Sequence, residues 1–184
     1  MKNSTKNLLQ RFLKNDATTL LLRLALLYIL WFLCRIVFYL QNAGLVGPLE
    51  WNEIPGLLRG AGMFDTASIL YVNALFILLS LLPFRFRETR RYQRILCWLY
   101  TVTNALALIV NSADGIYFHY ARKRFTSDEL SYLHNNDNTG TVVLKGLAEN
   151  WYIVLWCALL IAAMVWVYRR IKAMPTRIEN RWAY

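Results

Sequence analysis

The stretch that decides the fold is residues 20–40, LLLRLALLYILWFLCRIVFYL, in which Arg23 and Arg35 are the only charged residues. A helix rises about 1.5 Å per residue, so a run of this length reaches about 30 Å, the thickness of a bilayer's hydrocarbon core. Similar apolar runs follow at about 63–82, 95–116 and 151–168. The sequence therefore predicts an all-α, polytopic transmembrane helix bundle, with residues 1–184 forming one domain of four spans.

The composition agrees with a membrane protein and excludes a nucleic-acid-binding one. Hydrophobic residues make up 57% of the chain and charged residues only 17%. The net charge of +10 comes from short basic clusters between apolar runs rather than from one basic stripe. We therefore expect membrane lipids as partners and no nucleic acid.

Basic residues concentrate before the first span, between the second and third, and after the fourth. They are Lys2, Lys6, Arg11, Lys14, Arg85, Arg87, Arg90, Arg91, Arg94, Arg169, Arg170, Lys172, Arg177 and Arg181. The connections 41–62 and 117–150 contain fewer basic residues and several acidic ones. Because basic flanks of transmembrane helices stay in the cytoplasm, we expect the N-terminus and residue 184 to be cytoplasmic.

The end of the sequence predicts a further span in a longer parent protein. Residues 180–184, NRWAY, have the basic-then-aromatic order of a chain entering a bilayer. We expect a fifth span to follow. The first span is too long for the apolar region of a signal peptide and lacks a small-residue cleavage site, so it is expected to be a retained anchor.

The outer connections are expected to contain short interfacial helices. Thr126 and Glu129 have capping-box spacing before an apolar pair, which predicts one short helix. Residues 135–140 then form a turn-like cluster that includes Gly140, and the apolar residues 142–147 lead as an interfacial helix into Trp151.

Charged residues inside the spans are costly unless they are paired or hydrated. Arg23 lies near the cytoplasmic edge and is expected to anchor the helix by reaching lipid phosphates. Arg35, Asp65 and Asp114 lie in one depth zone near the outer ends of their spans, so Arg35 can pair with either carboxylate. Such a pair either joins helices or leaves a polar cluster that opens outward.

The third span adds polar residues that lead toward the same outer edge. Two interpretations stay open for them. They act as bonds between helices, or they form an outward seat that holds the phosphate of a lipid head group. The candidates for this polar cluster are Arg35, Asp65, Asn73, Asn104, Asn111, Asp114, Tyr117, Arg122 and Arg124.

The sequence contains no pattern typical of a catalytic or metal site. It has no phosphate-binding glycine loop, no dinucleotide fingerprint and no Cys and His metal spacing. His119 and His134 are isolated, and Cys34, Cys97 and Cys157 lie in apolar runs as small hydrophobes. We expect no catalytic residue, metal ligand or cofactor in this chain, and no turnover by it alone.

Two stretches carry a family resemblance. Residues 64–75, FDTASILYVNAL, followed by LLPF at 81–84, resemble the second span of bacterial lipoteichoic acid synthase-like membrane proteins. Residues 111–118, NSADGIYF, with Arg124 and Thr126 after them, resemble that family's third span and outer loop. Many relatives carry a basic residue where Met63 stands, which leaves Arg35 or Arg59 as the partner of Asp65.

The resemblance implies that this chain belongs to a bacterial inner-membrane protein with a transferase function. Five spans of such proteins lead into an extracytoplasmic domain of the alkaline phosphatase and sulfatase superfamily. That domain uses a divalent metal (Mn, Mg or Zn) and a threonine nucleophile to transfer phosphoglycerol or phosphoethanolamine. This chain would be the anchor that presents an anionic phospholipid donor to its own missing catalytic domain. The alternatives are a non-enzymatic scaffold or accessory subunit and, less favoured because the spans lack broken helices and repeats, a small transporter.

Overall fold

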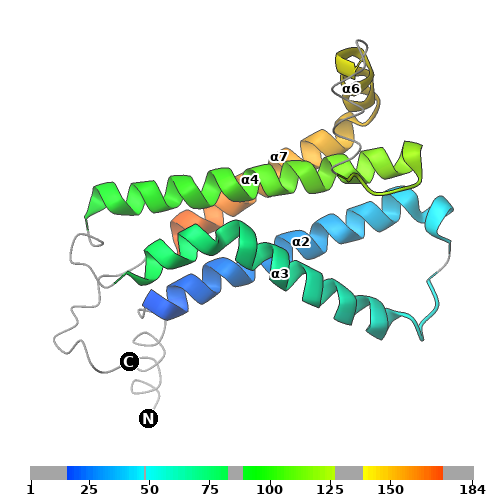
Figure 1. Ribbon diagram of the computed structural model, residues 1–184. Helices are drawn as coiled ribbons and strands as arrows, with labels where there is room; N and C mark the ends of the chain where they lie inside the picture. The colour runs from blue at the N-terminus through cyan, green and yellow to red at the C-terminus, as the bar shows by residue number, and fades with distance from the viewer. Residues whose placement is uncertain (1–15, 48, 83–88, 127–138, 172–184) are drawn as a thin grey trace.

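The computed structural model describes residues 16–47, 49–82, 89–126 and 139–171. Within these ranges the chain forms helices and no strand (Figure 1). The helices are α2 (Asp16–Val46), α3 (Ile54–Leu81), α4 (Arg90–Ala121), α6 (Thr139–Glu149) and α7 (Trp151–Arg170). All of them except α6 are long and apolar enough to cross a membrane. The predicted four-span, all-α bundle is confirmed, and the protein is a multi-pass membrane protein.

Each predicted span corresponds to a longer helix. α2 continues past residue 40 to Val46, and α3 begins at Ile54 rather than near residue 63. Hydropathy marks only the part of a helix that faces lipid, whereas backbone hydrogen bonding continues where the sequence becomes polar. The predicted helix after Thr126 lies outside the described residues. Gly140, which we expected in a turn, lies in α6 instead.

The four long helices lie side by side, and α4 packs against α2, α3 and α7. α2 and α7 run antiparallel: Arg23 of α2 contacts Ile171 just after α7, and Gln41 of α2 contacts Asn150 just before it. We call the end where α2 begins and α7 ends the terminal end, and the opposite one the α6 end. In Figure 1, α6 stands toward that opposite end and projects from one side of the bundle at a steep angle to the long helices.

Each long helix buries one stripe of residues spaced three or four apart, as expected for one face of a helix in a bundle. On α4 the stripe is Leu96, Tyr100, Asn104, Leu108 and Gly115, and on α7 it is Ile153, Cys157, Leu160, Met164 and Tyr168. The other faces of these helices expose large apolar side chains, such as Trp98 and Leu159. In a bilayer, lipid chains cover these faces.

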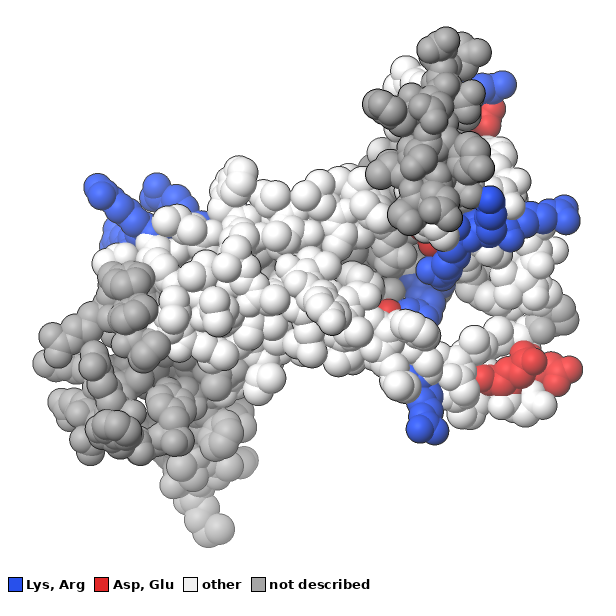
Figure 2. All heavy atoms as spheres, viewed as in Figure 1, with Lys and Arg blue, Asp and Glu red and all other residues white. Residues whose placement is uncertain are grey.

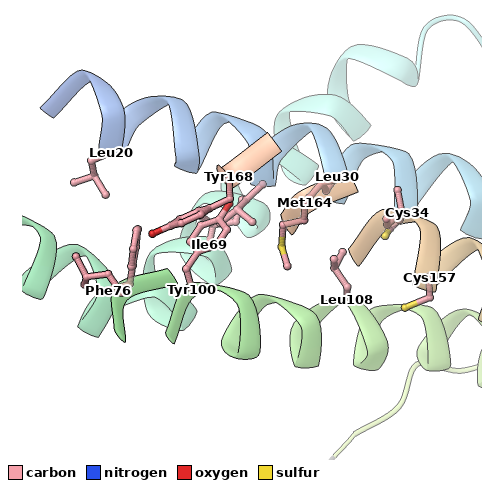
Figure 3. Close-up of a cluster of buried hydrophobic side chains, with 13 residues drawn as sticks. Leu20, Leu30, Cys34, Ile69, Phe76, Tyr100, Leu108, Cys157, Met164 and Tyr168 are labelled. Atoms are coloured by element: carbon pink, nitrogen blue, oxygen red, sulfur yellow. The ribbon is translucent and has the colours of Figure 1, made fainter. Parts of the chain in front are cut away.

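Aromatic rings fill the core toward the terminal end. The Tyr100 ring centroid lies 5.0 Å from that of Phe76 and 4.7 Å from that of Tyr168, so rings of α3, α4 and α7 meet. Figure 3 shows these rings with Ile69, whereas Cys34 and Cys157 lie farther along the core. The Tyr100 hydroxyl donates a 2.9 Å hydrogen bond to the Arg23 carbonyl, which ties α4 to α2.

The sequence predicts that the Arg23 side chain reaches lipid phosphates, but in the structure it has other partners. Its side chain is buried, its guanidinium donates to the Ile171 carbonyl at 3.2 Å, and the group stacks 4.0 Å from the Tyr168 ring centroid. A cation is stabilised at a helix C-terminus because the last carbonyls and the helix dipole are negative there. The end of α7 therefore takes the place of the lipid phosphate.

Asn73 and Asn104 join α3 to α4 in the middle of the bundle. Each amide nitrogen donates to the other's amide oxygen, at 3.0 and 2.8 Å, and both residues are fully buried. Each nitrogen also donates to a carbonyl of its own helix, that of Ile69 or Tyr100. This arrangement uses both hydrogens of each amide, so the pair acts as a bond between helices.

The amide pair predicts a measurable coupling energy. In a double-mutant cycle of Asn73→Ala and Asn104→Ala, we expect a coupling between about 0.6 and about 1.7 kcal/mol, the average and the maximum measured for such bonds in a membrane protein. The measurement is the free energy of unfolding of the purified protein in mixed micelles. A matched cycle of Asn73→Ala with Asn111→Ala should show no coupling, and equal coupling in the two cycles would contradict the pairing.

Candidate functional site

A first ion pair joins α2 to α3 toward the α6 end. An Arg35 Nη atom lies 2.5 Å from Asp65 Oδ1. Of the two partners that the sequence left open for Asp65, the structure selects Arg35 rather than Arg59. Asp65 is also the first buried residue of α3, so the pair lies where α3 begins to pack on the bundle.

The part of α3 before Asp65 packs little. No residue from Ile54 to Phe64 is buried, and Leu57, Met63 and Phe64 are exposed. In Figure 1 this part of α3 leans away from α2 toward the α6 end. Figure 2 shows the resulting hollow, with blue basic and red acidic side chains gathered around it. Charged groups therefore line an opening on the side of the bundle.

A second ion pair fastens the segment that follows α4. α4 ends at Ala121 and is capped by Arg122, whose backbone has a φ of 55° and whose N–H donates to the Phe118 carbonyl. The chain then folds back over Asp114: Phe125 N–H donates to Asp114 Oδ1 at 2.7 Å, and an Arg124 Nη atom lies 3.2 Å from Asp114 Oδ2. One carboxylate thus holds both the backbone and the cation of this segment.

The second pair brings Arg124 to the face of α2 that carries Arg35. The Arg124 guanidinium carbon lies 4.8 Å from the centroid of the Phe38 ring. Phe38 is three residues after Arg35, and residues three apart are neighbours on one helix face. Arg35 and the residue that the Arg124 guanidinium stacks on are therefore neighbours on α2, although Arg35 and Arg124 are 89 positions apart in the sequence.

The two pairs are exposed on one side only. The Arg35 and Arg124 side chains are 41% and 63% exposed, whereas the Asp65 and Asp114 side chains are each 12% exposed. A guanidinium has five N–H donors and no acceptor. Since the carboxylates are largely covered and the two arginine side chains are partly exposed, an approaching ligand meets hydrogen-bond donors and positive charge.

The depth of Arg35 follows from the alignment of α2 with α7. Gln41 donates to Asn150 directly before Trp151, the first residue of α7. Arg35 lies six residues earlier on α2, which is about 9 Å along the helix axis. This depth is within the hydrocarbon region near its edge, where an arginine side chain can extend to the head-group level.

Five other candidates take different positions. Asn73 and Asn104 bond to each other, and Asn73 is eight residues, about 12 Å, past Asp65 on α3. Asn111 lines a small cavity between α2, α4 and α7. Tyr117 packs edge-on against Phe125, and Arg122 is exposed at the end of α4. The central group is therefore Arg35, Asp65, Asp114 and Arg124, with Arg122 at its edge.

Sequence analysis missed a second polar group at the α6 end. Asn150 accepts from Gln41 and Tyr152 and donates to the Tyr120 hydroxyl, while Asn42 of α2 donates to the Gly115 carbonyl of α4 at 3.3 Å. A Cβ at Gly115 would lie 3.4 Å from Gln41 Oε1, so glycine permits this close contact. The sequence does contain a signal for this group, because two amide residues, Gln41 and Asn42, directly follow the apolar run 20–40.

The described residues offer no ligand set for a catalytic metal. In the ranges that the structure covers, no three His, Cys, Asp or Glu side chains gather in a way that could hold a metal ion.

Comparison with known proteins identifies no relative of this chain. No family model matches the chain, and no curated protein or solved structure matches it.

The role of Asp114 can be tested by the exchange of the Phe125 amide hydrogen. A hydrogen bond to a charged group contributes about 1.5–3 kcal/mol, and each 1.4 kcal/mol changes an equilibrium about tenfold. In Asp114→Ala we therefore expect Phe125 amide exchange, measured by mass spectrometry on short peptides, to be at least about tenfold faster. Asp65→Ala is the control and should leave it unchanged; unaltered exchange in Asp114→Ala would contradict the assignment.

Proposed function

We propose that this chain is the membrane anchor and lipid-presenting domain of an extracytoplasmic transferase that acts on a phospholipid head group. The observation that carries the proposal is a pair of arginines, Arg35 and Arg124, each bound to a largely covered carboxylate and itself partly exposed. Charge-assisted bonds from guanidinium to phosphate are strong and directional, so this geometry fits an anionic phospholipid donor.

The roles of the four residues differ in this proposal. Arg35 and Arg124 contact the phosphate, and Asp65 and Asp114 are positioning residues that hold the guanidiniums from behind. Two carboxylates balance two guanidiniums, which lowers the cost of placing cations near the hydrocarbon when no lipid is bound. A phosphate then displaces water from the exposed N–H groups.

The hollow beside α3 supports a lipid rather than a free anion as the ligand. The leaning first part of α3 leaves the charged groups open to the side of the bundle, which faces lipid in a bilayer (Figure 2). A phospholipid can enter from the side with its chains against exposed residues such as Leu57 and Leu58. Its phosphate then meets Arg35 near the edge of the hydrocarbon.

The transfer class comes from the resemblance to lipoteichoic acid synthase-like proteins. It implies phosphoglycerol or phosphoethanolamine transfer by a separate catalytic domain, with its metal there and no catalytic residue in this chain. In that setting the bundle would hold the lipid with its head group toward that domain, and the protein would reside in a bacterial inner membrane.

The proposal requires the α6 end to face away from the cytoplasm. The distribution of basic residues supports this orientation, with both termini inside. In intact cells, a membrane-impermeant maleimide should label Lys145→Cys and spare Arg91→Cys, since both residues are exposed but lie at opposite ends of the bundle. Labelling of Arg91→Cys alone would show the opposite orientation and would contradict an extracytoplasmic role for the α6 end.

Lipid binding by the arginines is tested with phosphatidylglycerol as the probe. We expect Arg35→Gln with Arg124→Gln to weaken its binding to the purified protein at least about tenfold, because charge-assisted hydrogen bonds are lost. Native mass spectrometry in detergent measures the bound lipid. The control, Arg59→Gln with Lys145→Gln, removes two cations from the same end and should bind as the unaltered protein does.

Arg124→Gln alone is the safeguard against misfolding, because its side chain is the more exposed of the two. It should reduce binding while the melting temperature stays unchanged. Equal lipid binding in all variants would contradict the proposal. The ion pairs would then only join helices, as in a membrane scaffold or accessory subunit.

A further inference from the structure

α6 starts from a well-defined depth in the membrane. α7 has 20 residues, so it is about 30 Å long and matches the hydrocarbon core. Its first residue, Trp151, is exposed. Because it begins a helix as long as the hydrocarbon core, it lies at the boundary between the hydrocarbon and the head groups, where tryptophan is favoured. One residue, Asn150, separates α7 from α6, and α6 projects from the bundle at a steep angle to the long helices (Figure 1). The helix therefore runs along the plane of the membrane surface.

α6 has two chemically different faces. Leu144 and Leu147 are exposed and lie on one side with Ala148, within an arc of about 100° on a helix of about 3.6 residues per turn. Lys145 and Glu149 lie on another side, four residues apart, with Nζ and Oε1 separated by 4.0 Å. Such a division between apolar and charged faces is typical of helices that lie in a membrane interface.

The charged face points away from the bilayer. Glu149 accepts a 2.9 Å hydrogen bond from the hydroxyl of Tyr120, which lies at the end of α4. In Figure 2 the blue and red atoms near α6 lie on the side away from the terminal end of the bundle. The leucines are on the opposite side of the helix and so face back toward the lipid that surrounds the bundle.

A buried amide holds α6 at this angle. The Asn150 side chain donates to the Gly146 carbonyl of α6 at 2.9 Å and to the Tyr120 hydroxyl at 3.3 Å. Its oxygen accepts from Gln41 of α2 and from Tyr152 of α7. Asn150 thus connects four helices at the point where the chain changes direction, so the orientation of α6 is part of the fold.

We propose that α6 is an interfacial helix that binds the membrane surface at the α6 end, with Leu144 and Leu147 inserted among the lipids. The partner is the lipid surface, because the apolar face of α6 continues through exposed Trp151 and Leu155 into the lipid-facing side of α7. The Tyr120–Glu149 bond then holds the end of α4, and with it the Arg122–Phe125 segment, at the head-group level. This inference does not depend on the proposed function.

The test measures how deep each face of α6 lies. A nitroxide label is attached at Leu144→Cys, Leu147→Cys or Lys145→Cys in a protein whose native cysteines are replaced by alanine, reconstituted in nanodiscs of phosphatidylcholine and phosphatidylglycerol. Collision with oxygen reports lipid, and collision with a water-soluble nickel chelate reports water. We expect a several-fold higher oxygen-to-nickel ratio at both leucine positions than at Lys145, with Leu155→Cys as the lipid-facing reference.

Equal, water-like ratios at all three positions would overturn the proposal, and so would a deeper Lys145. If the cysteine-free protein does not fold, a photoreactive amino acid at position 144 or 145 of the unaltered chain replaces the label. It should cross-link to phospholipid from position 144 and not from 145. Equal cross-linking from the two positions would overturn the proposal as well.

Discussion

Polar groups in the hydrocarbon region must find partners inside the protein, because neither lipid nor water is available to hydrogen-bond them. This constraint explains how the helices of this chain are held together. Asn73 and Asn104 satisfy each other between α3 and α4, and Arg35 with Asp65 joins α2 to α3. Apolar side chains gain little from leaving lipid for another helix, so the polar pairs and the close contact at Gly115 decide which helix faces meet.

The same constraint separates structural polar groups from those that can bind a ligand. The Asn73–Asn104 pair is fully buried, and each amide nitrogen has two acceptors, so nothing remains for a third partner. In the two ion pairs the carboxylates are largely covered, whereas the arginine side chains are partly exposed. An arginine that has one covered partner is held in place and still offers donors, which is the arrangement a phosphate-binding site requires.

Among the residues that the structure describes, the α6 end combines features that are not found at the terminal end. There the first part of α3 leaves the bundle, the segment after α4 folds back on Asp114, and Asn150 turns the chain from α6 into α7. These features surround one opening lined by charged groups. At the terminal end Arg23 is buried against the end of α7, so its charge is used within the bundle.

The sequence by itself determined the class of fold, because a helix must be about 20 apolar residues long to cross the hydrocarbon core and four such runs are present. It also placed Arg35, Asp65 and Asp114 at one depth, since depth follows from counting residues along a helix. It did not determine which carboxylate pairs with which cation, nor that Arg23 lies under the end of α7. Those choices depend on how the helices are rotated against one another and on how the segment after Arg122 folds back. Only the tertiary structure decided them, because spacing along one helix contains no information about the face of its neighbour.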